Sequence, residues 1–193
     1  MPNLKSENTL AISNIEKVEV MAKHFASISK EKNYSKTFIR KKHKFERQHL
    51  QTEPKIYKEN DYLNDTFAKH ELIAAIRSSK SSSAPGADNI YYDFIKHLPN
   101  SATAYLLQIY NQIWLEKTNI TEWKNSIIKP ILKAGEDPTK PVSYRPIALT
   151  SVLSKILERM VTNRLAYYLD KENLLNPNQT GFRKHRNTVK STC

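Results

Sequence analysis

Two basic residues on either side of a proline-containing turn are the clearest candidates for chemistry in this sequence. Lys133 follows the apolar run NSIIKPIL (125–132), and Arg145 lies within YRPIALT (144–150). Both runs are short and rich in branched residues, which predicts two strands joined by a turn-rich connector. If the strands pair as an antiparallel hairpin, the two cations come close together. The guanidinium offers a planar fork of donors that fits phosphate oxygens, and the ammonium adds a mobile point charge.

Such a pair of cations could hold a triphosphate and offset the negative charge that develops during phosphoryl or nucleotidyl transfer. Arg145 directly precedes Pro146, and a residue before proline favours the extended backbone of a strand. The residues alone leave a second interpretation open, in which Lys133 and Arg145 are ordinary surface cations on an exposed hairpin.

Carboxylates arranged for two-metal catalysis are missing from the sequence. No pair of adjacent aspartates occurs in a predicted strand. Glu136 and Asp137 are neighbours, but the proline-rich connector that contains them is a poor scaffold for a metal ion. We therefore expect no metal ligand, no catalytic residue and no cofactor in this chain.

Two further stretches have a composition that could suit contact with a polymer. In SSSAPGADNI (81–90), Pro85 and Gly86 predict a tight turn, Asp88 can hydrogen-bond its own backbone, and glycine lets another backbone approach closely. No Gly-Lys-Ser or Gly-Lys-Thr follows, so this turn is not a phosphate-binding P-loop. Read from the residues alone, it is a turn and little more.

The second stretch, QTGFRKHR (179–186), sets Phe182 beside Arg183, Lys184 and Arg186. An aromatic ring among cations is typical of a surface that stacks bases and grips a nucleic-acid backbone. A polar terminus with one buried phenylalanine explains the same residues equally well.

The charge balance of the whole chain favours a polyanionic partner. Its 193 residues include 31 basic and 19 acidic ones, which gives a formal net charge of +12. Such an excess indicates nucleic acid first and an anionic membrane surface second. A basic excess that only keeps the chain soluble is the plainer alternative.

Several other classes of protein are disfavoured by the sequence. Cys193 is the single cysteine, so neither a disulfide framework nor a zinc-ligand pattern is present. The first residues lack the apolar core of a signal peptide, and no run of about 18 apolar residues predicts a membrane span. We therefore expect an intracellular protein. No decisive targeting signal or indication of an oligomeric state is present.

Helices dominate the elements that we expect. Apolar residues recur at helical spacing in 10–29, 66–79, 99–117 and 151–174, with Thr66 as the expected cap of the second helix. Together with the strands, they predict a mostly helical α+β fold with one small antiparallel β-hairpin. Residues 30–50 hold eight basic and two acidic residues, half of the chain's positive excess. This stretch is interpreted as a solvated linker, with a polybasic arm that contacts a nucleic-acid backbone as the alternative.

Three segments, taken in order and at their spacing, resemble one known family. They are residues 67–99, with Ala-Pro-Gly-Ala-Asp, residues 122–165, with Ser-Tyr-Arg-Pro-Ile, and residues 173–189, with Gln-Thr-Gly-Phe-Arg. Together they look like the N-terminal part of the reverse transcriptase of non-LTR (LINE-type, jockey-like) retrotransposons. The resemblance runs from about Asn64 to Val189. It implies a basic helical or linker region over 1–63 and the fingers part of a polymerase domain over 64–193.

The resemblance also implies roles for individual residues. Lys133 and Arg145 would contact the phosphates of the incoming nucleotide, because the corresponding hairpin of the family belongs to the fingers. The remaining implied contacts are with template or other nucleic acid, and involve Pro85, Gly86, Asp88, Gln179, Gly181, Phe182 and Arg183.

The sequence departs from the family pattern at its end. In the family, the next strand carries the first metal-binding aspartate and a later hairpin carries an aromatic-x-Asp-Asp motif, whereas this chain stops at Cys193. We therefore expect a fragment that is inactive alone but contributes template and incoming-nucleotide contacts. Mg²⁺ is expected in the full-length parent, whose partners would be RNA template, DNA primer and deoxynucleotide. A non-catalytic nucleic-acid-binding protein and an inert remnant are the alternatives. Nuclear residence would suit a retrotransposon product.

Overall fold

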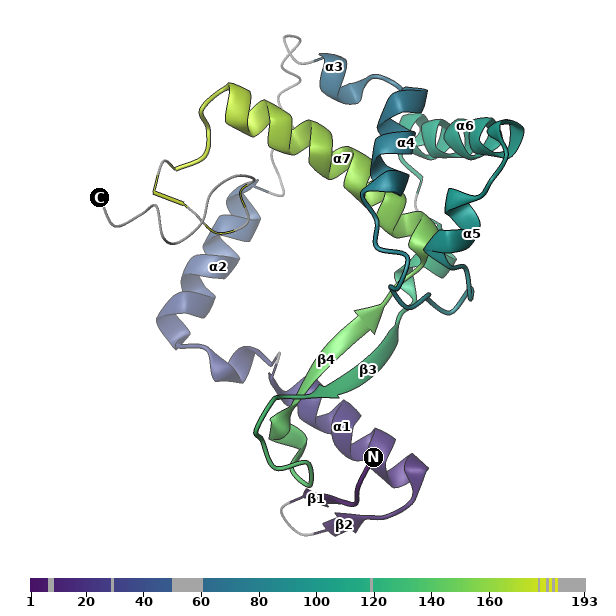
Figure 1. The fold of residues 1–193 in the computed structure, drawn as a ribbon. Coiled ribbons are helices and arrows are strands. Elements are labelled where there is room, and N and C mark those ends of the chain that lie inside the picture. Colours follow the sequence, from purple (N-terminus) through teal and green to yellow (C-terminus); the bar gives the residue numbers. More distant parts are fainter. Residues whose placement is uncertain are drawn as a thin grey trace. The chain divides into compact units, whose positions relative to one another are not determined.

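The computed structural model describes residues 1–6, 9–28, 30–49, 61–118, 120–176, 178–179, 181 and 183. The chain divides into two compact units, of which the first combines Met1–Lys58 with Ser126–Leu149 and the second combines Glu59–Asn125 with Thr150–Cys193. Figure 1 shows the elements of both units. The assignment of 1–63 to a basic region and of 64–193 to a polymerase region stays a prediction.

Two short hairpins and one helix surround the core of the first unit. Strands β1 (Leu4–Ser6) and β2 (Thr9–Ala11) pair antiparallel and lead into helix α1 (Asn14–Ile28). Its core is small and contains residues from both hairpins and from α1. Leu4, Ala11, Met21 and Tyr144 are buried together. The phenol of Tyr144 donates to the carbonyl of Pro138 at 2.8 Å, so this buried ring has a partner for its polar atom.

Helix α1 begins with a capping box, as its sequence Ser-Asn-Ile-Glu predicts. The backbone N–H of Glu16 donates to the Ser13 hydroxyl at 3.2 Å, and the Glu16 carboxylate accepts from the N–H groups of Ser13 and Ile12 at 2.9 Å. These bonds satisfy N–H groups that a helix start otherwise leaves unpaired. They lower the pKa of Glu16, because hydrogen bonds from Ser13 and Ile12 favour the ionised carboxylate.

The expected central hairpin is present. Strands β3 (Ile127–Leu132) and β4 (Tyr144–Leu149) pair antiparallel, and the short 3₁₀ helix η4 (Pro141–Ser143) precedes β4. Pro130 faces Pro146 across the pair. The N–H of Lys133 donates to Ser143 at 2.9 Å, so by the alternation of antiparallel ladders Pro130 and Pro146 occupy a pair that exchanges no hydrogen bonds. The prolines therefore remove no hydrogen bond between β3 and β4. At these two positions the outer edges of the hairpin also lack an N–H donor that could pair with another strand.

The basic stretch 30–50, interpreted above as a solvated linker, is helical over its described residues. A 3₁₀ turn, η1 (Glu31–Asn33), precedes helix α2 (Lys36–His49). Ser35 caps α2, because its hydroxyl accepts from the N–H of Phe38 at 3.2 Å. Lys, Arg, Gln and Glu are good helix formers, which outweighs the repulsion among the cations. The interpretation as a linker did not include this helix, although most of its side chains are solvent-exposed as expected.

The second unit is an assembly of helices around one apolar core. It contains α3 (Asp61–Asn64), α4 (Lys69–Arg77), α5 (Tyr92–Lys96), α6 (Asn100–Glu116), the 3₁₀ helix η3 (Thr121–Lys124) and α7 (Val152–Lys171). The most buried large side chains of this core come from α4, α6 and α7: Leu72, Tyr110, Val152, Ile156 and Met160.

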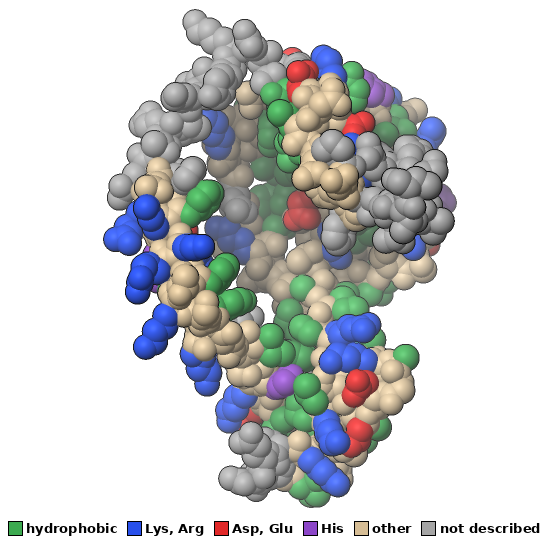
Figure 2. Space-filling model, turned by 90° about the vertical axis from the view of Figure 1, so that its left-hand side faces the viewer, with side chains coloured by type: hydrophobic (Ala, Val, Ile, Leu, Met, Phe, Trp, Pro, Cys, Tyr) green, Lys and Arg blue, Asp and Glu red, His purple; other side chains and the backbone are tan. Residues whose placement is uncertain are grey.

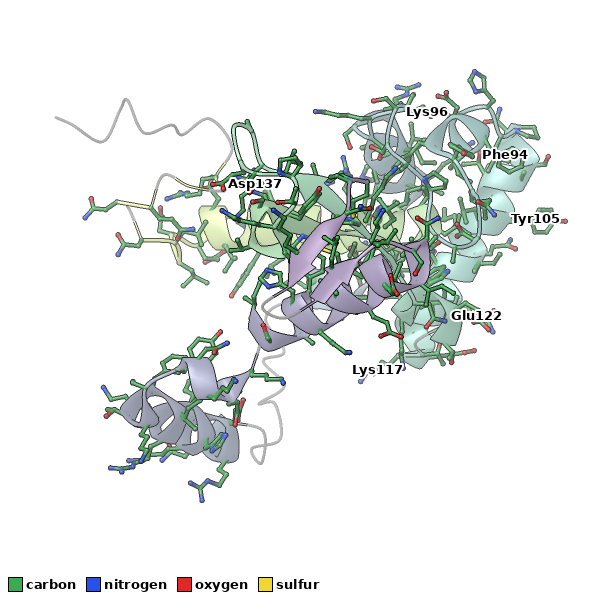
Figure 3. The ribbon with its side chains drawn as sticks, turned by 90° about the horizontal axis from the view of Figure 1, so that it is seen from below. Phe94, Lys96, Tyr105, Lys117, Glu122 and Asp137 are labelled. Carbon is green, nitrogen blue, oxygen red and sulfur yellow. The ribbon has the colours of Figure 1, made fainter. Side chains whose placement is uncertain are left out.

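Tyr110 shows how this core handles a polar atom. Its hydroxyl donates to the carbonyl of Leu153 at 2.9 Å, which ties α6 to the first turn of α7. Burial raises the pKa of Tyr110 far above its usual value, so the phenol stays neutral. Other aromatic residues of this unit are turned outward, and Phe94 and Tyr105 point away from the helices into solvent (Figure 3).

The start of α4 differs from the expected one. Ala68, not Thr66, is the cap residue, and Glu71 reaches back to accept from the N–H of Ala68 at 2.8 Å. The carbonyl of Thr66 instead accepts from Arg164 of α7 at 2.8 Å. The expected fold class is confirmed: the protein is a mostly helical α+β structure with small antiparallel strand pairs. Within the described ranges, no helix combines the length and the apolarity that a membrane crossing requires.

Candidate functional site

The register of the central hairpin sets Lys133 and Arg145 on one face. Arg145 pairs with Ile131 across β3 and β4, and Lys133 follows Ile131 by two residues. Side chains two residues apart in a strand share a face, and diagonal neighbours across a pair lie roughly 7–8 Å apart. The two cations are therefore diagonal neighbours, which is the placement that a shared phosphate ligand requires.

The backbone of Arg145 is fixed within the hairpin, whereas its side chain is exposed to solvent. Its backbone belongs to a hydrogen-bonded pair with Ile131, by the same alternation that places Pro146 in a non-bonded pair. Its side chain is exposed, and its guanidinium has no hydrogen bond or ion pair with any other residue that the structure describes. A fork of five donors on a fixed strand is thus available to a ligand.

Lys133 is more constrained. It is half-buried, and its ammonium donates to the carbonyl of Val142 at 2.8 Å across the turn. An ammonium has three donors, so two remain for a second partner. The tether fixes the position of the positive charge next to the start of β4.

A third cation on the same face was not found by sequence reasoning. Lys129 is exposed and precedes Ile131 by two residues, so it flanks Arg145 on the other diagonal. The alternation Lys129-x-Ile131-x-Lys133 carried this signal in the sequence. Neighbouring like charges on a strand face repel one another, and a bound polyanion would remove that repulsion. Lys129, Lys133 and Arg145 together form the cationic hairpin face.

The carboxylate nearest to Arg145 along the chain is already engaged. Asp137 accepts hydrogen bonds from the N–H and hydroxyl of Thr139 at 2.9 and 2.7 Å, and it lies 3.5 Å from Lys140. These contacts, with the Thr139 backbone bond first, lower the pKa of Asp137. The carboxylate thus closes the turn of the connector and neutralises Lys140 rather than Arg145.

The two faces of the hairpin have different surroundings. Exposed isoleucines alternate with the cations on the cationic hairpin face, and Ile131 and Ile147 are 42% and 46% exposed. On the opposite face, Pro130 and Pro146 line an apolar pocket of about 490 Å³ beside α1. On the same side as these prolines, Tyr144 packs with Met21 of α1 in the buried core, whereas Lys129 and Arg145 on the other face are exposed.

The predicted turn at 85–88 is packed against its own chain. Gly86 is buried, and a Cβ at this position would lie 2.6 Å from the carbonyl carbon of Thr150 and 2.7 Å from the nitrogen of Ser151. The predicted local bond of Asp88 is confirmed, because its Oδ1 accepts from the N–H of Ile90 at 3.2 Å. Its Oδ2 accepts from the Ser151 hydroxyl at 2.6 Å. The close approach that Gly86 allows is thus used by the backbone that precedes α7.

Arg183 is also tied to its own unit. The guanidinium of Arg183 donates to the carboxylate of Asp170 at 2.7 Å and to the carbonyl of Asn176 at 3.2 Å, and only 10% of this side chain is exposed. Gln179 reaches the carbonyl of Gly181 at 3.4 Å. Phe182 lies outside the described residues. The nucleic-acid contacts implied for these residues stay predictions.

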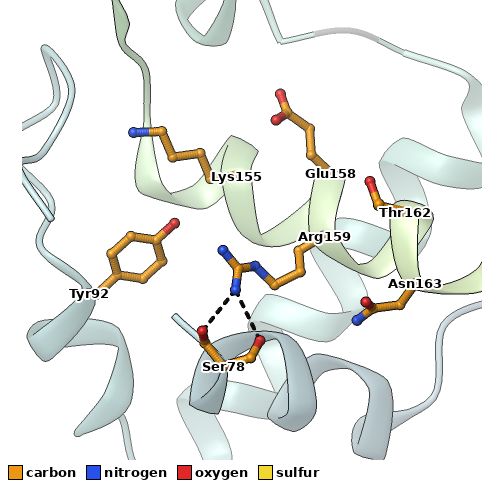
Figure 4. Close-up of a pocket in the computed structure, with 7 residues that line it drawn as sticks. All are labelled: Ser78, Tyr92, Lys155, Glu158, Arg159, Thr162 and Asn163. Carbon is orange, nitrogen blue, oxygen red and sulfur yellow. Dashed lines mark hydrogen bonds between the residues drawn. The ribbon is translucent and has the colours of Figure 1, made fainter. Parts of the chain in front are cut away.

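A polar pocket of about 450 Å³ lies beside α7 in the second unit (Figure 4). Arg159 crosses its floor and donates to the carbonyl and hydroxyl of Ser78 at 2.9 and 3.1 Å. Lys155 and Glu158 also line it. Because one of its cations is bonded within the chain and a carboxylate is present, this pocket favours an anion less than the cationic hairpin face does.

The described residues contain no candidate metal-binding site. No three His, Cys, Asp or Glu side chains of these residues gather closely enough to hold an ion.

Comparisons with known proteins point to one class of relatives. No protein-family profile matches the chain. Over 119 residues it is 40% identical to a probable RNA-directed DNA polymerase from transposon BS of Drosophila melanogaster, which is 62% of this chain and 13% of the relative. The corresponding polymerase of the X-element transposon is 32% identical over 64% of the chain and 14% of its own length.

The RNA-directed DNA polymerase of the mobile element jockey, also from Drosophila melanogaster, is 36% identical over 61% of this chain and 12% of its own length. The resemblance to jockey-like, non-LTR retrotransposon polymerases is therefore confirmed. The matched part of the chain spans about one eighth of the length of these relatives.

Proposed function

We propose that this chain supplies nucleotide and template contacts to an RNA-directed DNA polymerase of a non-LTR retrotransposon, as its N-terminal fingers part. The cationic hairpin face is the proposed site for the triphosphate of the incoming nucleotide. The observation that carries this proposal is the placement of Lys133 and Arg145 as diagonal neighbours on one strand pair, with the Arg145 guanidinium unpaired among the described residues. The sequence similarity to retrotransposon polymerases supports it.

The proposed role of the cations is electrostatic positioning. The planar fork of Arg145 can bind two phosphate oxygens at once, and Lys133 adds a charge whose position is fixed by Val142. Lys129 extends the positive face along β3. Groups that are already in place when charge develops on a phosphate lower the barrier without reorganising, which is the contribution that such a face can make to nucleotidyl transfer.

The proposed template contacts are Pro85, Gly86 and Asp88, together with Gln179, Gly181, Phe182 and Arg183. Because Gly86 is buried and the Asp88 carboxylate bonds Ser151, an RNA strand would lie against the exposed outer side of the turn. In this proposal the turn both fixes the start of α7 and presents its outer backbone to the template.

The chemical step is not assigned to this chain. The described residues do not fit a Mg²⁺ site, so the proposed role includes no step through the metal. Catalysis, Mg²⁺ binding and contacts with a DNA primer are proposed only for a longer parent protein. A primer-extension assay with this chain alone should give no incorporation.

The proposal is tested by titrating the chain with a fluorescent deoxynucleoside triphosphate in a buffer without divalent cations. Arg145→Gln should weaken binding about tenfold or more, since hydrogen bonds to charged groups contribute about 1.5–3 kcal/mol. Arg145→Lys should restore it only in part, because the fork is lost. Lys23→Gln is the matched control, since its side chain on α1 is 82% exposed. Equal affinities for the wild type, Arg145→Gln and the control would refute the proposed site.

A further inference from the structure

Helix α2 carries a second basic surface, which the proposed nucleotide site does not use. Lys36, Arg40, His43 and Arg47 follow one another at spacings of four, three and four residues. In a helix of 3.6 residues per turn, such positions lie in one stripe along a single face. The four are exposed, and Figure 2 shows basic side chains along the length of α2. The stripe is roughly 16 Å long at 1.5 Å per residue.

This stripe forms one wall of a groove of about 630 Å³, and the turn η1 forms the other wall. Glu31, Lys32 and Tyr34 from the η1 side, together with Ile39 of α2, complete its lining. The ring of Tyr34 stacks on Phe38, with ring centres 5.2 Å apart and planes at 30°. That contact holds an exposed aromatic ring at the edge of the cationic stripe. A groove with cations along one wall and an aromatic ring at its edge is what single-stranded nucleic acid needs.

An ion-pair cluster fixes the geometry of the groove. Glu31 of η1 accepts from the ammonium of Lys42 at 3.1 Å and lies 3.3 Å from Nε2 of His43. These bonds, that of Lys42 first, lower the pKa of Glu31. The carboxylate therefore stays ionised at neutral pH and keeps η1 beside α2. Glu31 neutralises part of the local charge, whereas Lys36, Arg40 and Arg47 have no carboxylate partner among the described residues.

We infer that α2 and η1 form a separate binding surface for single-stranded nucleic acid, with phosphates along Lys36, Arg40 and Arg47 and a base stacked on Tyr34. The composition of α2 favours this occupant over a membrane. Phe38, Ile39 and Phe45 are its only large apolar residues. Helices that lie in membrane surfaces insert a broad apolar face, and α2 does not have one. Because the surface is separate from the hairpin, this inference stands or falls independently of the proposed nucleotide site.

The test measures binding of the full chain to a fluorescein-labelled single-stranded oligouridylate by anisotropy, at several salt concentrations. The variant Arg40→Gln/Arg47→Gln removes two stripe cations. The control Lys41→Gln/Lys44→Gln removes the same charge from positions of α2 that do not line the groove. Glutamine is a good helix former, so α2 should persist in both, and circular dichroism checks this.

For single strands, the slope of log affinity against log salt is about −0.7 for each phosphate contact, so it becomes shallower by about 0.7 for each contact that is lost. The stripe variant should therefore lose about 1.4 from this slope, and the control should lose much less. Tyr34→Leu should weaken binding at least about fivefold with an unchanged slope, because stacking does not depend on salt in this way. Equal losses in the two double variants would show that only net charge matters and would overturn the inference.

A parallel titration with vesicles of phosphatidylserine and phosphatidylcholine distinguishes binding to nucleic acid from binding to an anionic membrane. Binding of wild type to RNA that exceeds its binding to vesicles, and that depends on Arg40 and Arg47, supports the inference. Stripe-dependent binding to vesicles without binding to RNA would overturn it in favour of a membrane surface.

Discussion

Asp88 and Ser151, 63 residues apart in the sequence, share a hydrogen bond of 2.6 Å at the start of α7. The Ser151 hydroxyl donates to the Asp88 carboxylate and accepts from the N–H of Leu153 at 3.2 Å. The carboxylate thereby orients the hydroxyl, so that its lone pair faces the unpaired N–H groups of the helix start. Two segments that carry the resemblance to retrotransposon polymerases are thus in direct contact.

Loss of this contact should destabilise the second unit. Ser151→Ala removes an N-cap and should lower the free energy of unfolding by about 1 kcal/mol, while Asp88→Asn should cost less, because an amide can still accept the bond. The double variant should lose less than the sum of the two, since the residues act on one another. Urea unfolding followed by circular dichroism measures all three. Ser82→Ala, an exposed serine of the same loop, is the control and should be neutral. Strict additivity would show that the two residues act separately.

Gly86 should be intolerant of any side chain. In Gly86→Ala the new methyl group would lie 2.6–2.8 Å from backbone atoms of Thr150 and Ser151, which cannot move without shifting the start of α7. Overpacking of this kind costs about 1–3 kcal/mol, so the unfolding midpoint should fall. Gly181→Ala is the matched control, because a Cβ there meets no atom of the described residues within 4 Å. A Gly86→Ala variant as stable as this control would contradict the packing described.

The ion pair between Glu71 and Arg164 should make the second unit sensitive to acid. Arg164 binds both carboxylate oxygens of Glu71 at 2.6 and 2.8 Å and lies over the ring of Phe67 at 4.2 Å, with 13% and 20% of the charged side chains exposed. The hydrogen bond from Arg164 is the main cause that lowers the pKa of Glu71 below its ordinary 4.5. The pair therefore stabilises the fold above about pH 4.5, and this contribution is lost as the pH falls through the folded-state pKa.

Glu71→Gln should consequently unfold more easily than wild type at pH 7. Its stability should also fall less than that of wild type between about pH 5 and pH 3, the range over which a carboxylate titrates. Removing one partner of a largely buried pair typically costs about 3 kcal/mol. Chemical denaturation at a series of pH values gives both quantities. Parallel pH profiles for the two proteins would show that Glu71 does not contribute through its charge.

Much of the fold followed from periodicity, and the failures have identifiable causes. The long helices α1, α6 and α7 and the central hairpin were predicted because their apolar residues repeat at 3.6 or at 2. Helix α5 has only five residues, too few for a period to appear. The cap of α4 was misplaced because Arg164, 98 residues from Thr66, uses the Thr66 carbonyl. Helix α2 was missed because its apolar residues are few, and its cap at Ser35 lies among charges.

The candidate site shows the same division. The antiparallel pairing expected from the two apolar runs was enough to bring Lys133 and Arg145 near each other, and alternation within β3 would also have shown Lys129. The bond of Asp88 to the nitrogen of Ile90 is local and was predicted from residue type. Its second bond, to Ser151, and the packing of Gly86 on Thr150 depend on tertiary contacts that no local pattern contains.

The most direct test of the proposed nucleotide site is a double-mutant cycle on Lys133 and Arg145, with the dissociation constant of a deoxynucleoside triphosphate as the measured quantity. If both cations hold the same triphosphate, Lys133→Gln and Arg145→Gln should each weaken binding, and the double variant should deviate from the sum by about 0.5 kcal/mol or more. Additive effects within about 0.3 kcal/mol, or unchanged affinity in both single variants, would contradict a shared phosphate site on the hairpin.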